Sequence, residues 1–189
     1  RYDAKLVNND GIDPECSRNV LIEGVEFNNG DDNVAIKSGR DNDGWNAKMP
    51  SENIIIRNCR FTMKGVPVLR TGENKIVAYR NGKQIEVGDP DCIGIQADKV
   101  SAKTNWGGHI WIDHCEFFNG DAANKDRYDG LLDCKNNVQW MTFSYNYFHD
   151  HDKSCLWGKG DSDVYENCRT ISFHHNFFDN IQGSRLPLQ

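Results

Sequence analysis

Two short acidic segments carry the side chains best suited to chemistry. Asp89 and Asp91 flank a proline, and Asp129 and Asp133 enclose the string Gly-Leu-Leu. Spacings of two and four residues put each pair on one face of an extended strand. Brought together, four carboxylates would offer only hard oxygen donors, which suit Ca²⁺ better than zinc. The sequence therefore predicts a calcium site, and the alternative is that these aspartates only form turns.

Two cationic side chains follow later segments at related positions. Lys153 comes five residues after Phe148, and Arg185 comes seven residues after Phe178. Both cations thus lie in the loop that follows the same kind of segment. If these segments stack on one another, their loops form one groove and the two cations lie in it. The alternative for each single charge is ordinary solvated surface.

A second acidic group lies near the start of the chain. Asp31 and Asp32 follow Asp10 by 21 and 22 residues, a separation that one turn of a repeating fold would span. Carboxylates that converge on one surface can divide into a general acid and a general base, because like charges push their pKa values apart. Here too the alternative is a role in turns.

A repeated strand has to position these side chains. Five segments share a frame that closes on phenylalanine: residues 19–27, 53–61, 108–117, 139–148 and 169–178. The residues five and seven places before each phenylalanine are apolar, so the period is two and one face of a strand is buried. A single unit cannot bury that face without a neighbour. We therefore expect an all-β fold, a right-handed single-stranded parallel β-helix.

Residues 63–90 interrupt the repeat. Extended runs at 76–80 and 83–87 flank Asn81-Gly82, which predicts a hairpin around a type I′ turn. We expect one β-helix domain over residues 1–189, in which this excursion separates the coils of 1–62 from those of 91–189. Neither end shows a capping segment, so we expect uncapped ends and a fragment of a longer protein.

The composition of the chain limits the classes of partner that it can bind. The formal net charge is -6, the pI is near 5.5 and the mean hydropathy is -0.72. Bulk charge therefore does not favour nucleic acid, and no apolar run reaches the ~20 residues that cross a membrane. An acidic substrate would need a local cationic patch or a bridging metal ion. The seven cysteines form no Cys-x-x-Cys motif and indicate neither a disulfide framework nor zinc. A monomer is expected.

Four strings in the second half occur in the order typical of one enzyme family: Trp111-Ile-Asp-His114, Asp129-Gly-Leu-Leu-Asp133, His151-Asp-Lys153, and Phe173-His-His-Asn176 with Arg185-Leu-Pro187. They resemble the pectate lyases, and the resemblance covers about residues 53–189. It implies four calcium ligands, namely Asp89, Asp91, Asp129 and Asp133. It further implies that Lys153 and Arg185 are catalytic. We assign structural roles to His114, His149 and His151.

The resemblance implies calcium-dependent β-elimination of α-1,4-linked polygalacturonate, with 4,5-unsaturated oligogalacturonides as products. The partner would be this pectic polysaccharide, and the protein would be secreted or periplasmic. Galacturonate carries a carboxylate at C6, so its C5 proton can be removed if the developing charge is stabilised. By resemblance Arg185 takes that proton, while Lys153 adds positive charge.

Residues 1 to about 62 resemble a second family, the polygalacturonases, through Asn8-Asn9-Asp10 and Gly30-Asp31-Asp32. By that resemblance Asp10, Asp31 and Asp32 match the catalytic carboxylates of a glycoside hydrolase. The Gly-His-Gly and Arg-Ile-Lys motifs of that family are absent. Three hypotheses therefore stand: a pectate lyase, a polygalacturonase-like hydrolase, and a non-catalytic or hybrid β-helix that only binds acidic glycan.

Overall fold

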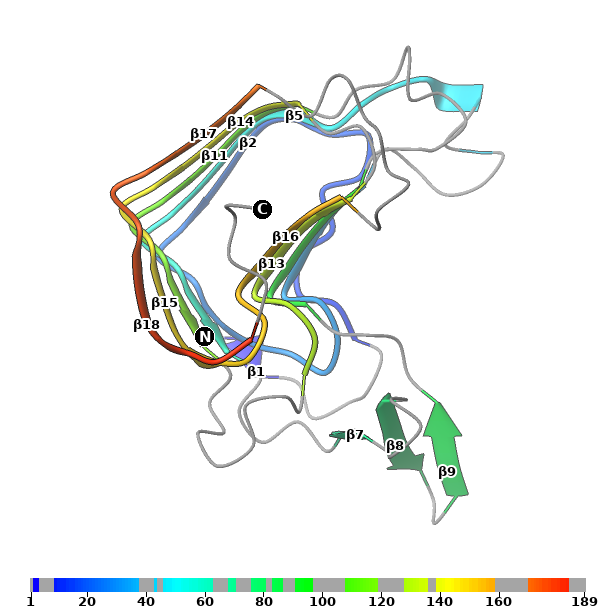
Figure 1. Cartoon of the computed structure of the whole chain (residues 1–189). Coiled ribbons are helices and arrows are strands. Elements are labelled where there is room, and N and C mark those ends of the chain that lie inside the picture. The colour runs from blue at the N-terminus through cyan, green and yellow to red at the C-terminus, as the bar shows by residue number, and fades with distance from the viewer. Residues whose placement is uncertain are drawn as a thin grey trace.

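The structure is a computed structural model of the whole chain. It describes residues 2–3, 9–37, 43, 46–62, 68–70, 76–80, 83–86, 91–96, 108–118, 128–135, 139–158 and 170–183. Three parallel sheets wrap around one core, as the view along the axis shows (Figure 1). Within the described residues, no helix is long and apolar enough to cross a membrane.

The chain visits the three sheets in a fixed order. Sheet I contains β2 (Arg18–Glu23), β5 (Glu52–Arg57), β11 (Gly108–Asp113), β14 (Gln139–Ser144) and β17 (Ile171–His174). Sheet II contains β1 (Tyr2–Asp3), β3 (Glu26–Asn28), β6 (Arg60–Thr62), β12 (Glu116–Phe118), β15 (Tyr147–His151) and β18 (Phe177–Ile181). Sheet III contains β4 (Val34–Ile36), β10 (Ile93–Gln96), β13 (Leu132–Lys135) and β16 (Cys155–Trp157).

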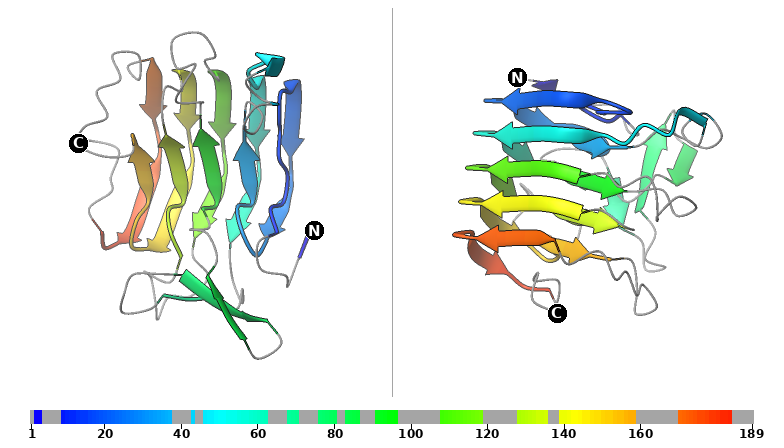
Figure 2. Two further views of the ribbon diagram at one scale, coloured as in Figure 1. Left: turned by 90° about the vertical axis from the view of Figure 1, so that its right-hand side faces the viewer. Right: turned by 90° about the horizontal axis from the view of Figure 1, so that it is seen from above.

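One strand from each sheet makes a coil, and the coils stack along the axis (Figure 2). Coil 1 is β2, β3 and β4, coil 2 begins with β5 and coil 3 with β11, coil 4 with β14, and coil 5 contains β17 and β18. In Figure 1 the C-terminal coils face the viewer, and the chain turns counterclockwise from sheet I through sheet II to sheet III. The solenoid is therefore right-handed, and the expected parallel β-helix is confirmed.

Stacked phenylalanines form the centre of the core, and they are the residues that define the repeat. Their ring centroids lie 4.9, 4.7, 4.7 and 5.0 Å apart along the series Phe27, Phe61, Phe117, Phe148 and Phe178. The strands of sheet I add a second buried row, because Ile22, Ile56 and Ile112 pair in register. The period of two is therefore correct, with alternate residues of β11 buried and exposed.

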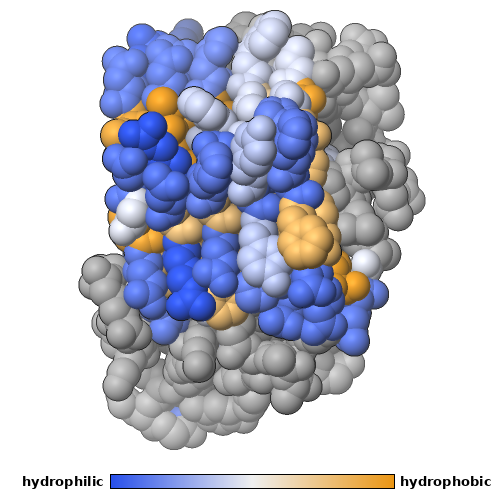
Figure 3. All heavy atoms as spheres, turned by 90° about the vertical axis from the view of Figure 1, so that its left-hand side faces the viewer, coloured by the Kyte–Doolittle hydropathy of each residue, from blue (hydrophilic) through white to orange (hydrophobic). Residues whose placement is uncertain are grey.

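Polar ladders complete the stack at the corner between sheets I and II. The Asn146 Nδ2 group donates to Asn176 Oδ1 and to the Ile112 carbonyl, both at 3.0 Å. At the preceding corner position, equivalent residues adopt positive φ, from Gly24 at 67° to His114 at 50° and Tyr145 at 54°. The left-handed conformation turns the chain sharply between the two sheets. The outer face at this corner is mostly hydrophilic, with scattered apolar residues (Figure 3).

The interruption lies within coil 2, between β6 and β10, and contains a small antiparallel sheet. It consists of β7 (Val68–Arg70), β8 (Ile76–Arg80) and β9 (Lys83–Glu86), and Arg80 pairs with Lys83. The two strands of the predicted hairpin are thus confirmed, whereas the turn residues 81–82 lie outside the described residues. Figure 1 shows this sheet projecting from the solenoid near one end of sheet III.

Candidate functional site

Three buried carboxylates meet beside sheet III. One oxygen from each of Asp91, Asp129 and Asp133 lies within 4.8 Å of the other two. Their residues are 3, 8 and 0% exposed, although each carries an ionisable group. Buried charges need compensation by an opposite charge or a metal ion. The structure therefore brings together three of the four predicted calcium ligands.

The register of sheet III places these side chains. Gly94 of β10 pairs with Asp133 of β13, so Asp91, which precedes β10, lies beside the segment that precedes β13 in the next coil. The Cys92 amide donates to the Gly130 carbonyl at 3.1 Å, and the Gly130 amide donates to Asp91 Oδ1 at 2.8 Å. The main chain at Gly130 thus holds the Asp91 carboxylate beside the segment that carries Asp129.

Gly130 allows this close approach. A Cβ atom at this position would lie 2.1 Å from Asp133 Oδ1 and 2.7 Å from its carboxyl carbon. Both distances are far shorter than a van der Waals contact. The Asp133 carboxylate therefore packs directly on the backbone of residue 130, and only glycine fits there without a shift.

Two lysines contact the three carboxylates. The Lys153 ammonium donates to Asp129 Oδ1 at 3.3 Å. Lys135 is the last residue of β13, and its Nζ atom lies 3.2 Å from Asp91 Oδ2 and 3.3 Å from Asp133 Oδ2. Burial alone lowers the pKa of Lys135, but the carboxylates of Asp91 and Asp133 outweigh burial and raise it. Lys135 is therefore charged, and it partly neutralises the cluster.

The pKa of Asp91 shows how crowded the charges are. Burial raises this pKa well above its ordinary value, and the negative charge of Asp133 raises it further. A divalent cation between the carboxylates would offset the repulsion between Asp91 and Asp133. Three hard oxygen donors at this spacing, next to a glycine that leaves room for them, fit calcium and are unsuited to zinc, which prefers nitrogen and sulfur.

His151 supports the cluster from behind. Its side chain is fully buried, and its Nε2 atom donates to the carbonyl oxygen of Asp129. Burial lowers the pKa of His151, so the ring is neutral near pH 7. The imidazole therefore fixes the main chain of a candidate ligand, in agreement with the structural role expected for it.

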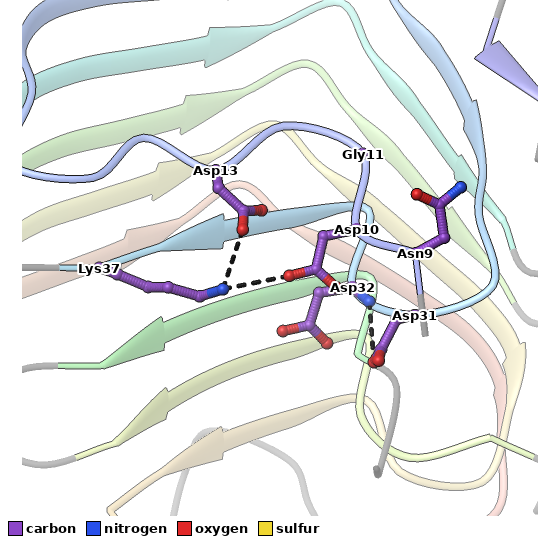
Figure 4. Close-up of a pocket in the computed structure, with 7 residues that line it drawn as sticks. All are labelled: Asn9, Asp10, Gly11, Asp13, Asp31, Asp32 and Lys37. Carbon is purple, nitrogen blue, oxygen red and sulfur yellow. Dashed lines mark hydrogen bonds and ion pairs between the residues drawn. The ribbon is translucent and has the colours of Figure 1, made fainter. Parts of the chain in front are cut away.

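A second acidic pocket lies one coil closer to the N-terminus, and Figure 4 shows it. Its volume is about 610 Å³, and its lining residues are Asn9, Asp10, Gly11, Asp13, Asp31, Asp32 and Lys37. The Lys37 ammonium bridges Asp10 Oδ2 at 3.1 Å and Asp13 Oδ2 at 2.9 Å. The three carboxylates predicted to converge, Asp10, Asp31 and Asp32, thus line one pocket.

Asp32 connects this pocket to the three-carboxylate cluster. Its Oδ1 atom accepts a hydrogen bond from the Asp91 amide at 2.8 Å. Burial raises the pKa of Asp32 to about 7, and burial followed by the charge of Asp10 raises the pKa of Asp31 to about 6. The two acidic sites therefore form one continuous stripe along adjacent coils.

Of the six site residues predicted from the sequence, the structure describes four, and these four lie together: Asp91, Asp129, Asp133 and Lys153. Asp89 and Arg185 lie outside the described residues. Sequence reasoning missed Lys135. A signal was available, because Lys135 follows Asp133 by two residues and so shares its face of the strand.

Comparison with known proteins identifies relatives over most of the chain. A sequence model of the family described as pectate lyase matches residues 19–189. A pectate trisaccharide-lyase of Bacillus licheniformis is 43% identical over 137 residues, which are 71% of this chain and 37% of that protein. The chain thus spans little more than a third of this curated relative.

Solved structures agree with the fold. A pectate lyase studied for substrate specificity and an anti β-elimination mechanism superposes with a TM-score of 0.51 at 25% identity, covering 86% of this chain and 36% of that one. A pectate lyase bound to a hexasaccharide gives a TM-score of 0.50 at 26% identity, with the same two coverages.

The family match begins well before residue 53, where the resemblance to pectate lyases was expected to start. From residue 19 onward, coils 1 and 2 therefore fall within the family match. This part includes β3 and β4, whose residues were expected to resemble polygalacturonases. With this match over most of the chain, the β-helix that carries the three-carboxylate cluster belongs to the pectate lyase family.

Proposed function

We propose that this chain is the β-helical core of a calcium-dependent pectate lyase, which cleaves α-1,4-linked polygalacturonate by β-elimination. The observation that carries the proposal is the cluster of Asp91, Asp129 and Asp133, buried within 4.8 Å of one another with Lys153 in contact. The names of the relatives support the reaction class, and the hexasaccharide bound to one of them supports a saccharide substrate.

Calcium accounts for the binding of a polyanion by an acidic protein. The chain has a net charge of -6, and each galacturonate residue adds a further negative charge. A calcium ion held by Asp91, Asp129 and Asp133 would link the protein to a sugar carboxylate and stabilise negative charge at C5. The buried position of the three carboxylates strengthens such an interaction because little water screens it.

The residues of the chain have separate roles in the elimination. Lys153 provides a compact positive charge beside the C6 carboxylate of the substrate, which gains negative charge when the C5 proton is removed. Arg185, by resemblance, accepts the C5 proton; the electron pair of the C5–H bond then forms the C4–C5 double bond, and the O4 glycosyl group leaves. Because free arginine has a pKa above ~12, a neutral guanidine is rare at pH 7. The rate should therefore rise as the pH becomes alkaline.

The product gives a direct test. Polygalacturonate is incubated with the chain in calcium and in chelator, and the ultraviolet absorbance of the unsaturated end is recorded. Absorbance with calcium and none with chelator is the expected result. Asp133→Asn should abolish the signal, whereas Asp43→Asn, at an exposed position outside the site, should not. A chain that forms no unsaturated product in either condition does not have the proposed function.

A second candidate function is glycoside hydrolysis in the neighbouring pocket. The specific observation in its favour is that Asp10, Asp31 and Asp32 line one pocket and that burial raises the pKa of each. A carboxyl group with a pKa near 6 or 7 can donate a proton at neutral pH. Hydrolysis would release reducing ends without ultraviolet absorbance, would persist in chelator and would be lost in Asp32→Asn.

The third hypothesis, glycan binding without catalysis, is separated by the same measurements. A chain that binds oligogalacturonate in calorimetry but yields neither absorbance nor reducing ends would be a binding module. Calcium dependence of that binding would still assign the cluster of Asp91, Asp129 and Asp133 as a bridging site.

A further inference from the structure

Lys135 contacts two of the three carboxylates that would hold the proposed calcium ion. Its Nζ atom lies 3.2 Å from Asp91 Oδ2 and 3.3 Å from Asp133 Oδ2. Its side chain is only 25% exposed, and both aspartates are buried. The ammonium therefore lies among the buried carboxylates and not on the exposed surface around them.

An ammonium and a calcium ion compete for these two oxygens. Calcium needs its oxygen ligands at about 2.3–2.6 Å, and it needs six to eight of them. An ammonium that remains hydrogen-bonded to the same pair of oxygens would stand within a few ångströms of the ion and repel it. Calcium binding is therefore opposed while Lys135 remains on Asp91 and Asp133.

We infer that Lys135 is an internal competitor for the cation site, which neutralises the calcium-free cluster and sets the calcium affinity by having to be displaced. This inference rests on the proposed calcium dependence and concerns affinity and not turnover. The side chain is long enough to swing outward, because a lysine stem has four rotatable carbons and the ammonium is readily hydrated. A structural lysine would strengthen the folded site, whereas a competitor weakens calcium binding.

The solenoid supplies a matched control. Ile36 pairs with Ile95, and Ile95 pairs with Cys134, so Lys37 and Lys135 follow equivalent positions of sheet III. Lys37 also folds back onto two carboxylates, but its partners are Asp10 and Asp13. Removal of either lysine changes the net charge equally. Of these two lysines, Lys135 contacts Asp91 and Asp133 of the three-carboxylate cluster, whereas Lys37 contacts Asp10 and Asp13.

The experiment is a calcium titration by calorimetry of the wild type, Lys135→Met and Lys37→Met in chelator-treated protein at fixed ionic strength. Lys135→Met should bind calcium about tenfold more tightly, a change of about 1.4 kcal/mol. Lys37→Met should change the affinity by less than about twofold, because salt screens its more distant charge. Unchanged or weaker calcium binding by a folded Lys135→Met would overturn the inference.

A second measurement covers the case in which Lys135→Met folds poorly. Amine acylation of the wild type, followed by mass spectrometry, should label Lys135 faster with calcium than with chelator, because displacement exposes its Nζ atom. Equal labelling in both conditions would overturn the inference. Lys135→Arg retains the charge and should bind calcium nearly as the wild type does.

These results are distinguishable from a failure of the proposed function. Tighter calcium binding by Lys135→Met, together with no unsaturated product from any chain, would refute the lyase and leave the competitor role intact. Unsaturated product from the wild type, together with unaltered calcium binding by Lys135→Met, would refute only the competitor role. A wild type and a Lys135→Met chain that both fail to bind calcium would refute both.

Discussion

Asp32 and Lys153 occupy equivalent positions, each two residues before a strand of sheet III. The pairing of Val34 with Ile93, of Ile93 with Leu132, and of Leu132 with Cys155 makes them members of one row. In successive coils that row consists of Asp32, Asp91, Gly130 and Lys153. Its charge therefore changes from negative to positive along the axis, so the cation stands on the C-terminal side of the carboxylates.

This position makes Lys153 the first residue to test by mutation. Lys153→Gln should reduce the rate of unsaturated product formation by about 10²–10³-fold, as expected when one group that stabilises developing charge is removed. Absorbance assays at saturating calcium measure the effect, and Lys48→Gln, at an exposed position far along the sequence, is the control. A Lys153→Gln chain as active as the control would show that the charge plays no part in the reaction.

The second prediction concerns Gly130. In Gly130→Ala the added methyl group would meet the Asp133 carboxylate, so the carboxylate or the backbone must shift. We expect a loss of about 1–3 kcal/mol in unfolding free energy together with weaker calcium binding. Gly24→Ala is the matched control, because nothing lies within 4 Å of its Cβ position and only its φ of 67° is strained. The control should lose stability but keep its calcium affinity.

The third prediction is a pH dependence of stability in chelator. The pKa of Asp31 in the folded chain, about 6, is above its ordinary value of 3.8, because of burial and then the charge of Asp10. The folded state therefore keeps the proton where the unfolded state has lost it. The stability from Asp31 is full below about pH 4 and is lost as the pH rises through about 6.

Urea denaturation between pH 4 and pH 7 measures this contribution. Asp31→Asn cannot titrate, so its stability should decline less over this window, by about 1–2 kcal/mol after allowance for the partial exposure of the group. Asp43→Asn, outside the pocket, should decline like the wild type. Parallel profiles for the wild type and Asp31→Asn would contradict the prediction.

The fourth prediction tests the phenylalanine stack. Phe117 is fully buried, with neighbouring rings 4.7 Å away on both sides, so Phe117→Ala should cost about 3–5 kcal/mol. Phe177, one residue before the last member of the stack, is 63% exposed, and Phe177→Ala should cost less than about 1 kcal/mol. Thermal or urea unfolding compares the two. Equal losses would show that the stack is not the principal support of the core.

The sequence could reveal the solenoid because the repeat is written in residues that face the core. Phe61 and Phe117 are far apart in the chain, yet both end a segment of alternating apolar residues, and in the structure they stack. The convergence of Asp129 and Asp133 with Asp91 was also predictable, since parallel coils bring equivalent loops together.

The contacts of Lys135 were not predictable in the same way. Its partner Asp91 lies in the preceding coil, 44 residues earlier in the chain, so only the pairing of Gly94 with Asp133 reveals their proximity. A rotamer that folds back onto two carboxylates leaves no periodic trace in the sequence. The same reason applies to the hydrogen bond between Asp32 and the Asp91 amide.

The row that runs from Asp32 to Lys153 takes one member from each of coils 1 to 4, while the phenylalanine stack of sheet II uses the same residue type in successive coils. The phenylalanine stack is thus interchangeable from one coil to the next, but the charged row is not. Duplication or deletion of one entire coil would leave the stack continuous and yet bring different side chains into adjacency. Gain or loss of whole coils would therefore rearrange the charged row while the phenylalanine stack stays continuous.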